Sequence, residues 1–228
     1  MSDGFALRRE HLLSENLERA AELFRSLGLS VTSPEERAAS LDAILARTRP
    51  GEDVWVFGYG SLMWNPAFHH VEACAARVRG WHRSFCLWNT FGRGSPDNPG
   101  LTLALESGGS CLGLALRVEA SAVRGELTVL WNREMLSGSY LPRWVQATSP
   151  AGPIQAVSFV ANRGHDRYAG RLPVARIAER LAHARGPLGA AREYLERTVE
   201  ELERHGARDG SMHELLLAVR ALTGPEFG

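Results

Sequence analysis

Glu134 is the residue in this sequence best placed for acid–base chemistry. It continues an apolar stripe at helical spacing, made of Val123, Leu127, Leu130 and Trp131. A carboxylate on a buried stripe must be paired with another group or be used in a reaction. Burial and the negative end of the helix dipole would both raise its pKa toward the range of a general base. The alternative is that the helix frays at Arg133 and that Glu134 reaches solvent or pairs with an arginine.

The second candidate is the segment Tyr59-Gly60-Ser61-Leu62, which follows a short β-type run ending at Gly58. Two glycines allow a sharp turn that leaves consecutive backbone N–H groups facing one point. Such a nest binds a carboxylate or an oxyanion. Dinucleotide binding is excluded, because Met63-Trp64-Asn65-Pro66 stands where a third glycine and a helix are required. The alternative is an ordinary turn at the end of a strand.

Other candidate motifs do not have the required spacing. Adjacent side chains point apart, so His69-His70 is expected at the surface and not at a metal. Gly109-Ser110-Cys111-Leu112-Gly113 does not match the nucleophile elbow of a serine hydrolase. The cysteines share no metal-type spacing, and their number is odd: Cys74, Cys86 and Cys111. We therefore expect no metal site and no disulfide framework.

All 26 basic residues are arginine, and they balance 26 acidic residues. Without lysine, the chain cannot be a Schiff-base enzyme, an ordinary P-loop NTPase or a protein kinase. Zero net charge argues against a broad nucleic-acid or anionic-membrane surface. No apolar run approaches the roughly 20 residues of a membrane span, and the N-terminus is charged throughout. The sequence predicts a cytoplasmic protein with no nucleic-acid or membrane partner.

The chain divides into two parts that must position these candidates. Residues 1–51 form a predicted helical extension, with one helix from Arg8 to Leu27 and a second that starts at a capping box, Ser33 to Glu36. The apolar side of the first helix is predicted to carry Leu13, Leu17, Ala20, Phe24 and Leu27. Residues 52–228 form the main domain.

The main domain is predicted to be rich in short strands. The strand-like runs are Val54–Phe57, Ala75–Val78, Trp81–Trp88, Leu101–Leu105, Leu112–Val118, Tyr140–Ala147 and Ile154–Ala161. Two predicted helices cover residues 119–135 and 174–184. A third begins at Gly186-Pro187, and a fourth begins after Ser211. Residues 92–100 are predicted to form a loop. This pattern favours an α+β fold, a closed or nearly closed mixed barrel flanked by helices.

Five segments together resemble the bacterial ChaC-type γ-glutamylcyclotransferases. They are FGYGSLMWNP, RGWHRSFCLW, GRGSPDNPGLTLAL, LWNREMLSGSYLPRWV and GPLGAAREYL, and the similarity covers about residues 52–223 in order. The resemblance implies a small mixed barrel with flanking helices. It also implies the release of 5-oxoproline from a γ-glutamyl substrate, which is glutathione in this branch of the family.

The resemblance implies roles for particular residues. Glu134 corresponds to the catalytic glutamate, Tyr59-Gly60-Ser61-Leu62 to the pocket loop, and Tyr194 to a tyrosine that lines the pocket. We expect Arg93 to bind the glycine carboxylate of glutathione. The reaction is intramolecular, so no cofactor or metal is expected. Two alternatives stay open, a relative that acts on other γ-glutamyl amino acids or amines and a non-catalytic barrel. The oligomeric state and the role of residues 1–51 are also open.

Overall fold

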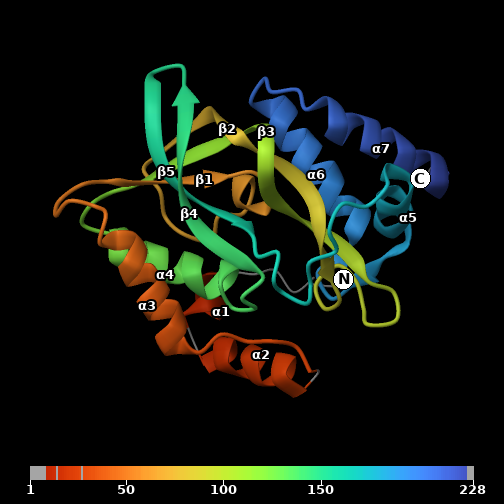
Figure 1. The fold of residues 1–228 in the computed structure, drawn as a ribbon, viewed down its shortest axis with the longest axis horizontal. Coiled ribbons are helices and arrows are strands. Elements are labelled where there is room, and N and C mark those ends of the chain that lie inside the picture. The colour runs from red at the N-terminus through yellow and green to blue at the C-terminus, as the bar shows by residue number, and fades with distance from the viewer. Residues whose placement is uncertain (1–8, 14, 27, 225–228) are drawn as a thin grey trace.

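The computed structural model describes residues 9–13, 15–26 and 28–224, and its centre is a closed five-stranded barrel. The strands lie in the order β1-β3-β2-β4-β5 (Figure 1). Their bounds are Val54–Gly58 for β1, Glu72–Asn89 for β2, Gly100–Val118 for β3, Tyr140–Ser149 for β4 and Gly152–Ala161 for β5. Strands adjacent in this order are antiparallel, whereas β5 pairs in parallel with β1, which closes the barrel, and at one position with β3. The predicted mixed barrel is confirmed.

β2 and β3 form one long antiparallel hairpin where the sequence predicted four separate strands. The prediction was wrong because Gly80 was taken as the end of a strand. Gly80 instead has φ of 80°, which favours glycine, and the pairing continues past it with a register shift between Arg79 and Trp81. A bulge of this kind bends the strand and helps the sheet curve into a barrel.

One side of the barrel carries the first four helices (Figure 1). They are α1 (Arg9–Leu12), α2 (Glu15–Ser26), α3 (Pro34–Leu45) and α4 (Val123–Glu134). The capping box at Ser33 is confirmed. Leu13 is 56% exposed, so its predicted place on the apolar side is wrong, whereas Leu17 is buried. Arg8 and Leu27, the predicted ends of the first helix, lie outside the described residues. Residues 119–122 form a turn, so α4 begins later than predicted.

The other side carries α5 (Val174–His183), α6 (Ala191–Arg204) and α7 (Gly210–Thr223) (Figure 1). The prediction that a helix opens at Gly186-Pro187 was wrong. Arg185–Gly186 (β6) pairs with Gly189–Ala190 (β7), and Gly189 has φ of 98°. A Cβ on Gly186 would lie 2.5 Å from the carbonyl oxygens of Gly92 and Gly94, so this small hairpin packs tightly on the glycine-rich loop.

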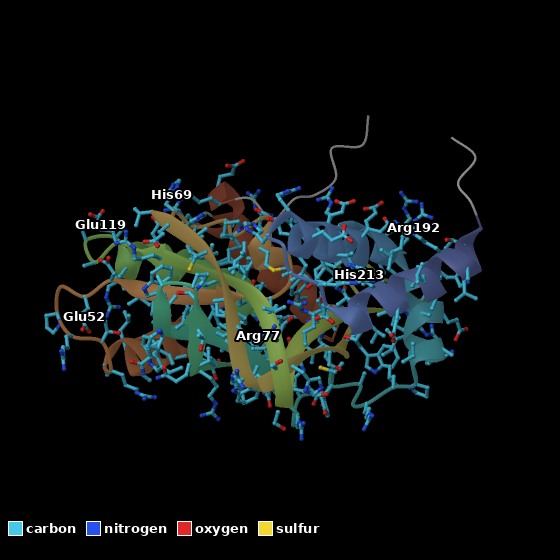
Figure 2. All side chains as sticks on the ribbon, turned by 90° about the horizontal axis from the view of Figure 1, so that it is seen from above. Glu52, His69, Arg77, Glu119, Arg192 and His213 are labelled. Atoms are coloured by element: carbon cyan, nitrogen blue, oxygen red, sulfur yellow. The ribbon has the colours of Figure 1, made fainter. Side chains whose placement is uncertain are left out.

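Two apolar cores fix the helices to the barrel. One joins the barrel interior to α5, α6 and α7, and the other fills the space between the barrel and α3 and α4. Charged side chains surround the molecule, and His69 lies at its edge, as predicted (Figure 2). Among the described residues, no helix has both the length and the apolar character needed to cross a membrane.

Candidate active site

A pocket of about 270 Å³, which includes its open mouth, lies where β1 ends against α4 and α6. Its walls are formed by Tyr59, Gly60, Ser61, Leu62, Leu103, Glu134, Tyr140, Phe159 and Tyr194. The structure therefore brings together six residues that the sequence singled out, Glu134, the four-residue loop and Tyr194.

Glu134 is the last residue of α4, and its side chain is 14% exposed. The stripe before it is buried, so the helix does not fray before Glu134, and the carboxylate lies at the pocket wall. Burial raises the pKa of Glu134, while the neighbouring Arg133 guanidinium acts in the opposite direction. A buried carboxyl group with a raised pKa has the character of a general base.

Arg133 joins the two parts of the site. Its Nε lies 2.9 Å from the Glu134 carboxylate, and its Nη2 donates a hydrogen bond of 2.7 Å to Ser61 Oγ. It also donates to the backbone carbonyl of Asn65, after the loop. The Arg133 side chain is only 4% exposed, so these contacts are shielded from bulk water. One guanidinium therefore fixes the distance between the carboxylate and the loop.

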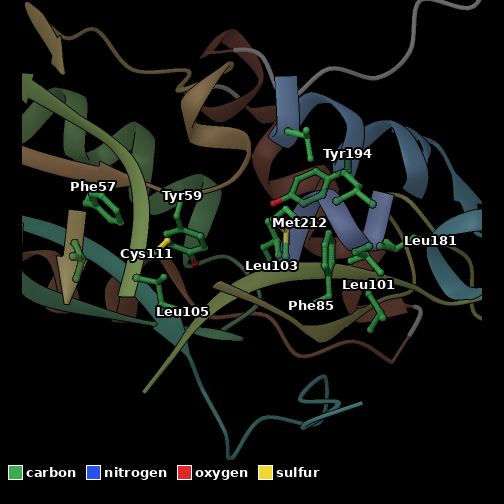
Figure 3. Packing of buried hydrophobic residues seen from close by; sticks show 14 of the residues in the cluster. Phe57, Tyr59, Phe85, Leu101, Leu103, Leu105, Cys111, Leu181, Tyr194 and Met212 are labelled. Atoms are coloured by element: carbon green, nitrogen blue, oxygen red, sulfur yellow. The ribbon is translucent and has the colours of Figure 1, made fainter. Parts of the chain in front are cut away.

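Tyr194 lies against the loop at Gly60. A Cβ on Gly60 would be 2.5 Å from Tyr194 Oη, so only glycine lets the hydroxyl come this close. Figure 3 shows Tyr194 reaching from α6 toward Leu103 and Tyr59. Burial raises the pKa of Tyr194, and hydrogen bonds from Thr102 and the Ser61 backbone act against this rise. The Tyr194 phenol therefore stays protonated and neutral, as a hydrogen-bond donor must be.

Two further tyrosines enclose the carboxylate. Tyr59 Oη donates to the carbonyl of Phe159 at 2.7 Å, and Tyr140 Oη donates to that of Leu103 at 2.8 Å. Burial, reinforced by the nearby Glu134 charge, raises the pKa of both well above that of a free tyrosine. Both phenols therefore stay neutral. Each hydroxyl already donates its proton to a backbone carbonyl, so the two side chains serve as walls of the pocket.

Arg93 is the one predicted site residue that does not line the pocket. Its Nη1 donates to the Ala190 carbonyl at 2.7 Å and lies 3.3 Å from Glu193 Oε2. Its guanidinium carbon is 5.9 Å from the centre of the Tyr194 ring. Arg93 thus lies near the Tyr194 ring but outside the pocket lining. Its role in binding a substrate carboxylate stays a prediction.

Sequence reasoning missed four residues: Leu103, Arg133, Tyr140 and Phe159. Pairing of Glu134 with an arginine was one of the alternatives, but Arg133 itself was named only as the place where the helix would fray. The presence of an arginine directly before a buried glutamate was the available signal. The other three lie on β3, β4 and β5, and no sequence periodicity says which positions of separate strands meet at one pocket.

Comparisons with known proteins agree with this architecture. The profile of the family described as ChaC-like protein matches residues 54–222. The chain is 44% identical over 197 residues to the glutathione-specific γ-glutamylcyclotransferase of Escherichia coli strain K12, covering 86% of this chain and 85% of that protein. It is 33% identical over 165 residues to the human glutathione-specific γ-glutamylcyclotransferase 1, covering 70% and 74% respectively.

The fold has a counterpart among solved structures. The crystal structure of a γ-glutamyl cyclotransferase specific to glutathione from yeast superposes with a TM-score of 0.68 at 19% identity. The match covers 74% of this chain and 96% of the yeast chain, so it supports the fold. Together, the matched profile and the extensive identity to the bacterial relative show that this chain belongs to the ChaC-like protein family.

Proposed function

We propose that this protein cleaves glutathione by intramolecular cyclisation and releases 5-oxoproline and Cys-Gly. The observation that carries the proposal is a buried carboxylate, Glu134, facing the Tyr59–Leu62 loop across one small pocket. The bacterial and human relatives, both named glutathione-specific γ-glutamylcyclotransferases, support glutathione as the substrate. We place the reaction in the cytoplasm, because the three cysteines are free thiols, as is usual in a reducing compartment.

The first task of the site is to bind and fold the γ-glutamyl group. The α-amine must approach its own γ-carbonyl carbon, and the pocket supplies this near-attack shape. We assign binding of the α-carboxylate and of the developing oxyanion to the Tyr59–Leu62 backbone, with the Ser61 hydroxyl as a further contact. In the short 3-10 helix Ser61–Met63, the first hydrogen bond runs from the Met63 N–H to the Gly60 carbonyl, so the Leu62 N–H precedes it.

The second task is proton transfer. Glu134 takes a proton from the substrate ammonium, and the free amine attacks the γ-carbon to form the new C–N bond. When the bond to the cysteine nitrogen breaks, Glu134 returns a proton to that leaving amine. Two protons leave the attacking nitrogen in all, and both end on the amine of Cys-Gly, so no water is consumed.

The third task is to stabilise the negative charge that develops on the γ-carbonyl oxygen in the transition state. The Tyr194 hydroxyl retains its own proton beside the loop, and we propose that it donates to the oxyanion together with the loop backbone. The enzyme needs no nucleophile of its own, because the substrate brings its amine to the reaction.

The direct test is a product assay with two substrates. Purified full-length protein is incubated with glutathione or with γ-glutamyl-alanine, and 5-oxoproline and the released amine are quantified. We expect 5-oxoproline and Cys-Gly from glutathione at a much higher kcat/KM than any product from γ-glutamyl-alanine. The reverse preference would identify an enzyme for other γ-glutamyl compounds, and no product from either would support a non-catalytic barrel.

Glu134→Gln is the matched control for this assay. Glutamine keeps the shape of the side chain but cannot accept the proton, so we expect kcat to fall by about 10² or more. Binding of glutathione, measured by isothermal titration calorimetry, should change little. Turnover near that of the wild type would exclude Glu134 as the base.

A further inference from the structure

The N-terminal segment lies outside residues 54–222, which the family profile matches, yet it contacts the end of the helix that bears Glu134. Thr32 is the centre of this contact. Its Oγ1 donates to the Met135 carbonyl at 2.8 Å and lies 3.3 Å from the Leu136 carbonyl. Its backbone N–H donates to the Leu136 carbonyl at 2.9 Å. Thr32 thus satisfies carbonyls at a helix end, where intrahelical donors are lacking.

Arg37 fixes Thr32 to α4 from a second direction. Its Nη1 donates to the Thr32 carbonyl at 2.6 Å, and its Nε donates to Asn132 Oδ1 at 3.2 Å. Asn132 in turn donates from Nδ2 to the Leu12 carbonyl at 2.9 Å. Arg37 is buried, so these hydrogen bonds are protected from water. Contacts from the extension therefore reach both sides of Glu134 in the sequence, at residue 132 and at residues 135–136.

The same segment also touches Phe91, directly before the glycine-rich loop of residues 92–100. The rings of Phe24 and Phe91 meet edge to face, with their centres 4.6 Å apart. The Asn89 side chain accepts from the N–H groups of Gly92 and Arg93, and Arg93 lies near the Tyr194 ring. The extension therefore contacts the end of α4 that carries Glu134 and, through Phe24, the segment of chain that leads to Arg93.

We propose that Thr32 is a positioning residue for Glu134 and that the N-terminal segment is a working part of the catalytic unit. This inference rests on the proposed function, in which Glu134 is the base. A general base must be held close to its productive geometry, and a displacement of about 1 Å can lower the rate by about 10². By bonding the carbonyls directly after Glu134, Thr32 restricts the last turn of α4.

The test uses Thr32→Val in the full-length protein. Valine keeps the branched shape and the backbone N–H bond but removes the hydroxyl donor. We expect kcat for 5-oxoproline formation to fall about five- to tenfold with KM within twofold, because the pocket walls stay in place. Thr32→Ser restores a hydroxyl and should recover most of kcat.

Arg124→Gln is the matched control. It removes the ion pair between Arg124 and Asp42, which also joins α4 to α3 but at the opposite end of α4 from Glu134. Its kcat should equal that of the wild type. A Thr32→Val enzyme with unchanged kcat, or with a loss that Thr32→Ser does not rescue, would overturn the proposal.

A second measurement separates this inference from the proposed function. Titration of the Glu134 carboxyl, followed by carbon-13 NMR, does not depend on turnover. We expect Thr32→Val to move the pKa of Glu134 toward that of a free glutamate, as water reaches the loosened helix end, and both Thr32→Ser and Arg124→Gln to leave it in place. If the wild type makes no 5-oxoproline, the proposed function fails, and an unchanged titration in Thr32→Val independently rejects the positioning role.

Discussion

The two halves of the site, the end of α4 and the loop Tyr59–Leu62, are built in opposite ways. The end of α4 is held by side chains, since Arg133 binds the Glu134 carboxylate and Thr32 binds the carbonyls beyond it. The loop depends on missing side chains, because a Cβ on Gly60 would collide with Tyr194 Oη.

Glycine is required at Gly60 by close approach, because a Cβ there would lie 2.5 Å from Tyr194 Oη. Gly113 shows the same requirement, because a Cβ there would lie 2.3 Å from the Gly58 carbonyl oxygen. Arg83 is a further buried polar anchor of the loop, which donates to the Tyr59 carbonyl at 2.9 Å and pairs with Asp209 at 2.8 Å. The comparison teaches that the helix end can be adjusted by conservative changes, whereas an atom added at Gly60 must displace Tyr194.

After the loss of Glu134 itself, the largest expected effect comes from Arg133, the group that joins the two halves. Arg133→Gln removes the ion pair with Glu134 and the charged donor to Ser61, so kcat/KM at pH 7 should fall about 10- to 100-fold, the scale of a lost charged hydrogen bond. The base must be ionised, and Arg133 opposes the burial that raises the pKa of Glu134. The acid limb of the pH–kcat/KM profile should therefore move to higher pH. A profile that stays in place would show that the two halves are not coupled through Arg133.

Gly60→Ala should have a smaller effect, confined to the loop. The added methyl must displace the Tyr194 hydroxyl, and overpacking of this kind costs about 1–3 kcal/mol. We expect KM for glutathione to rise about tenfold. Combining Gly60→Ala with Tyr194→Phe removes the collision, so the two losses should not add. Strict additivity in this double-mutant cycle would contradict the proposed close contact.

The smallest expected effect is a change in stability at a glycine that lies outside the site. Gly125 lies exposed within α4, and a Cβ there would meet no atom within 4 Å. Gly125→Ala should raise the free energy of unfolding by about 0.5–1 kcal/mol, because alanine loses less backbone entropy in a helix. Denaturant unfolding measures the gain, and kcat and KM should match the wild type. A change in activity would mean that Glu134 responds to the stability of the whole helix and not to its end.

Local sequence signals predicted the elements well where one physical rule dominated. The capping box at Ser33 and the buried stripe leading to Glu134 follow from helical spacing, and the structure has both. The signals failed at glycines, since Gly80 continues a strand through a bulge and Gly186 belongs to a small hairpin. A glycine permits several conformations, and its neighbours in space decide which one forms.

The sequence by itself determined the chemistry that this protein is equipped to perform. It contains no lysine, a glutamate on a buried stripe and a glycine loop at the end of a strand, and the spacing of these features is local. Only the tertiary structure decided which residues surround that glutamate. Tyr140, Leu103 and Phe159 come from three different strands, and Thr32 reaches Met135 across more than 100 residues of chain. Such contacts depend on barrel closure and on how the extension packs, and helical or strand periodicity does not encode them.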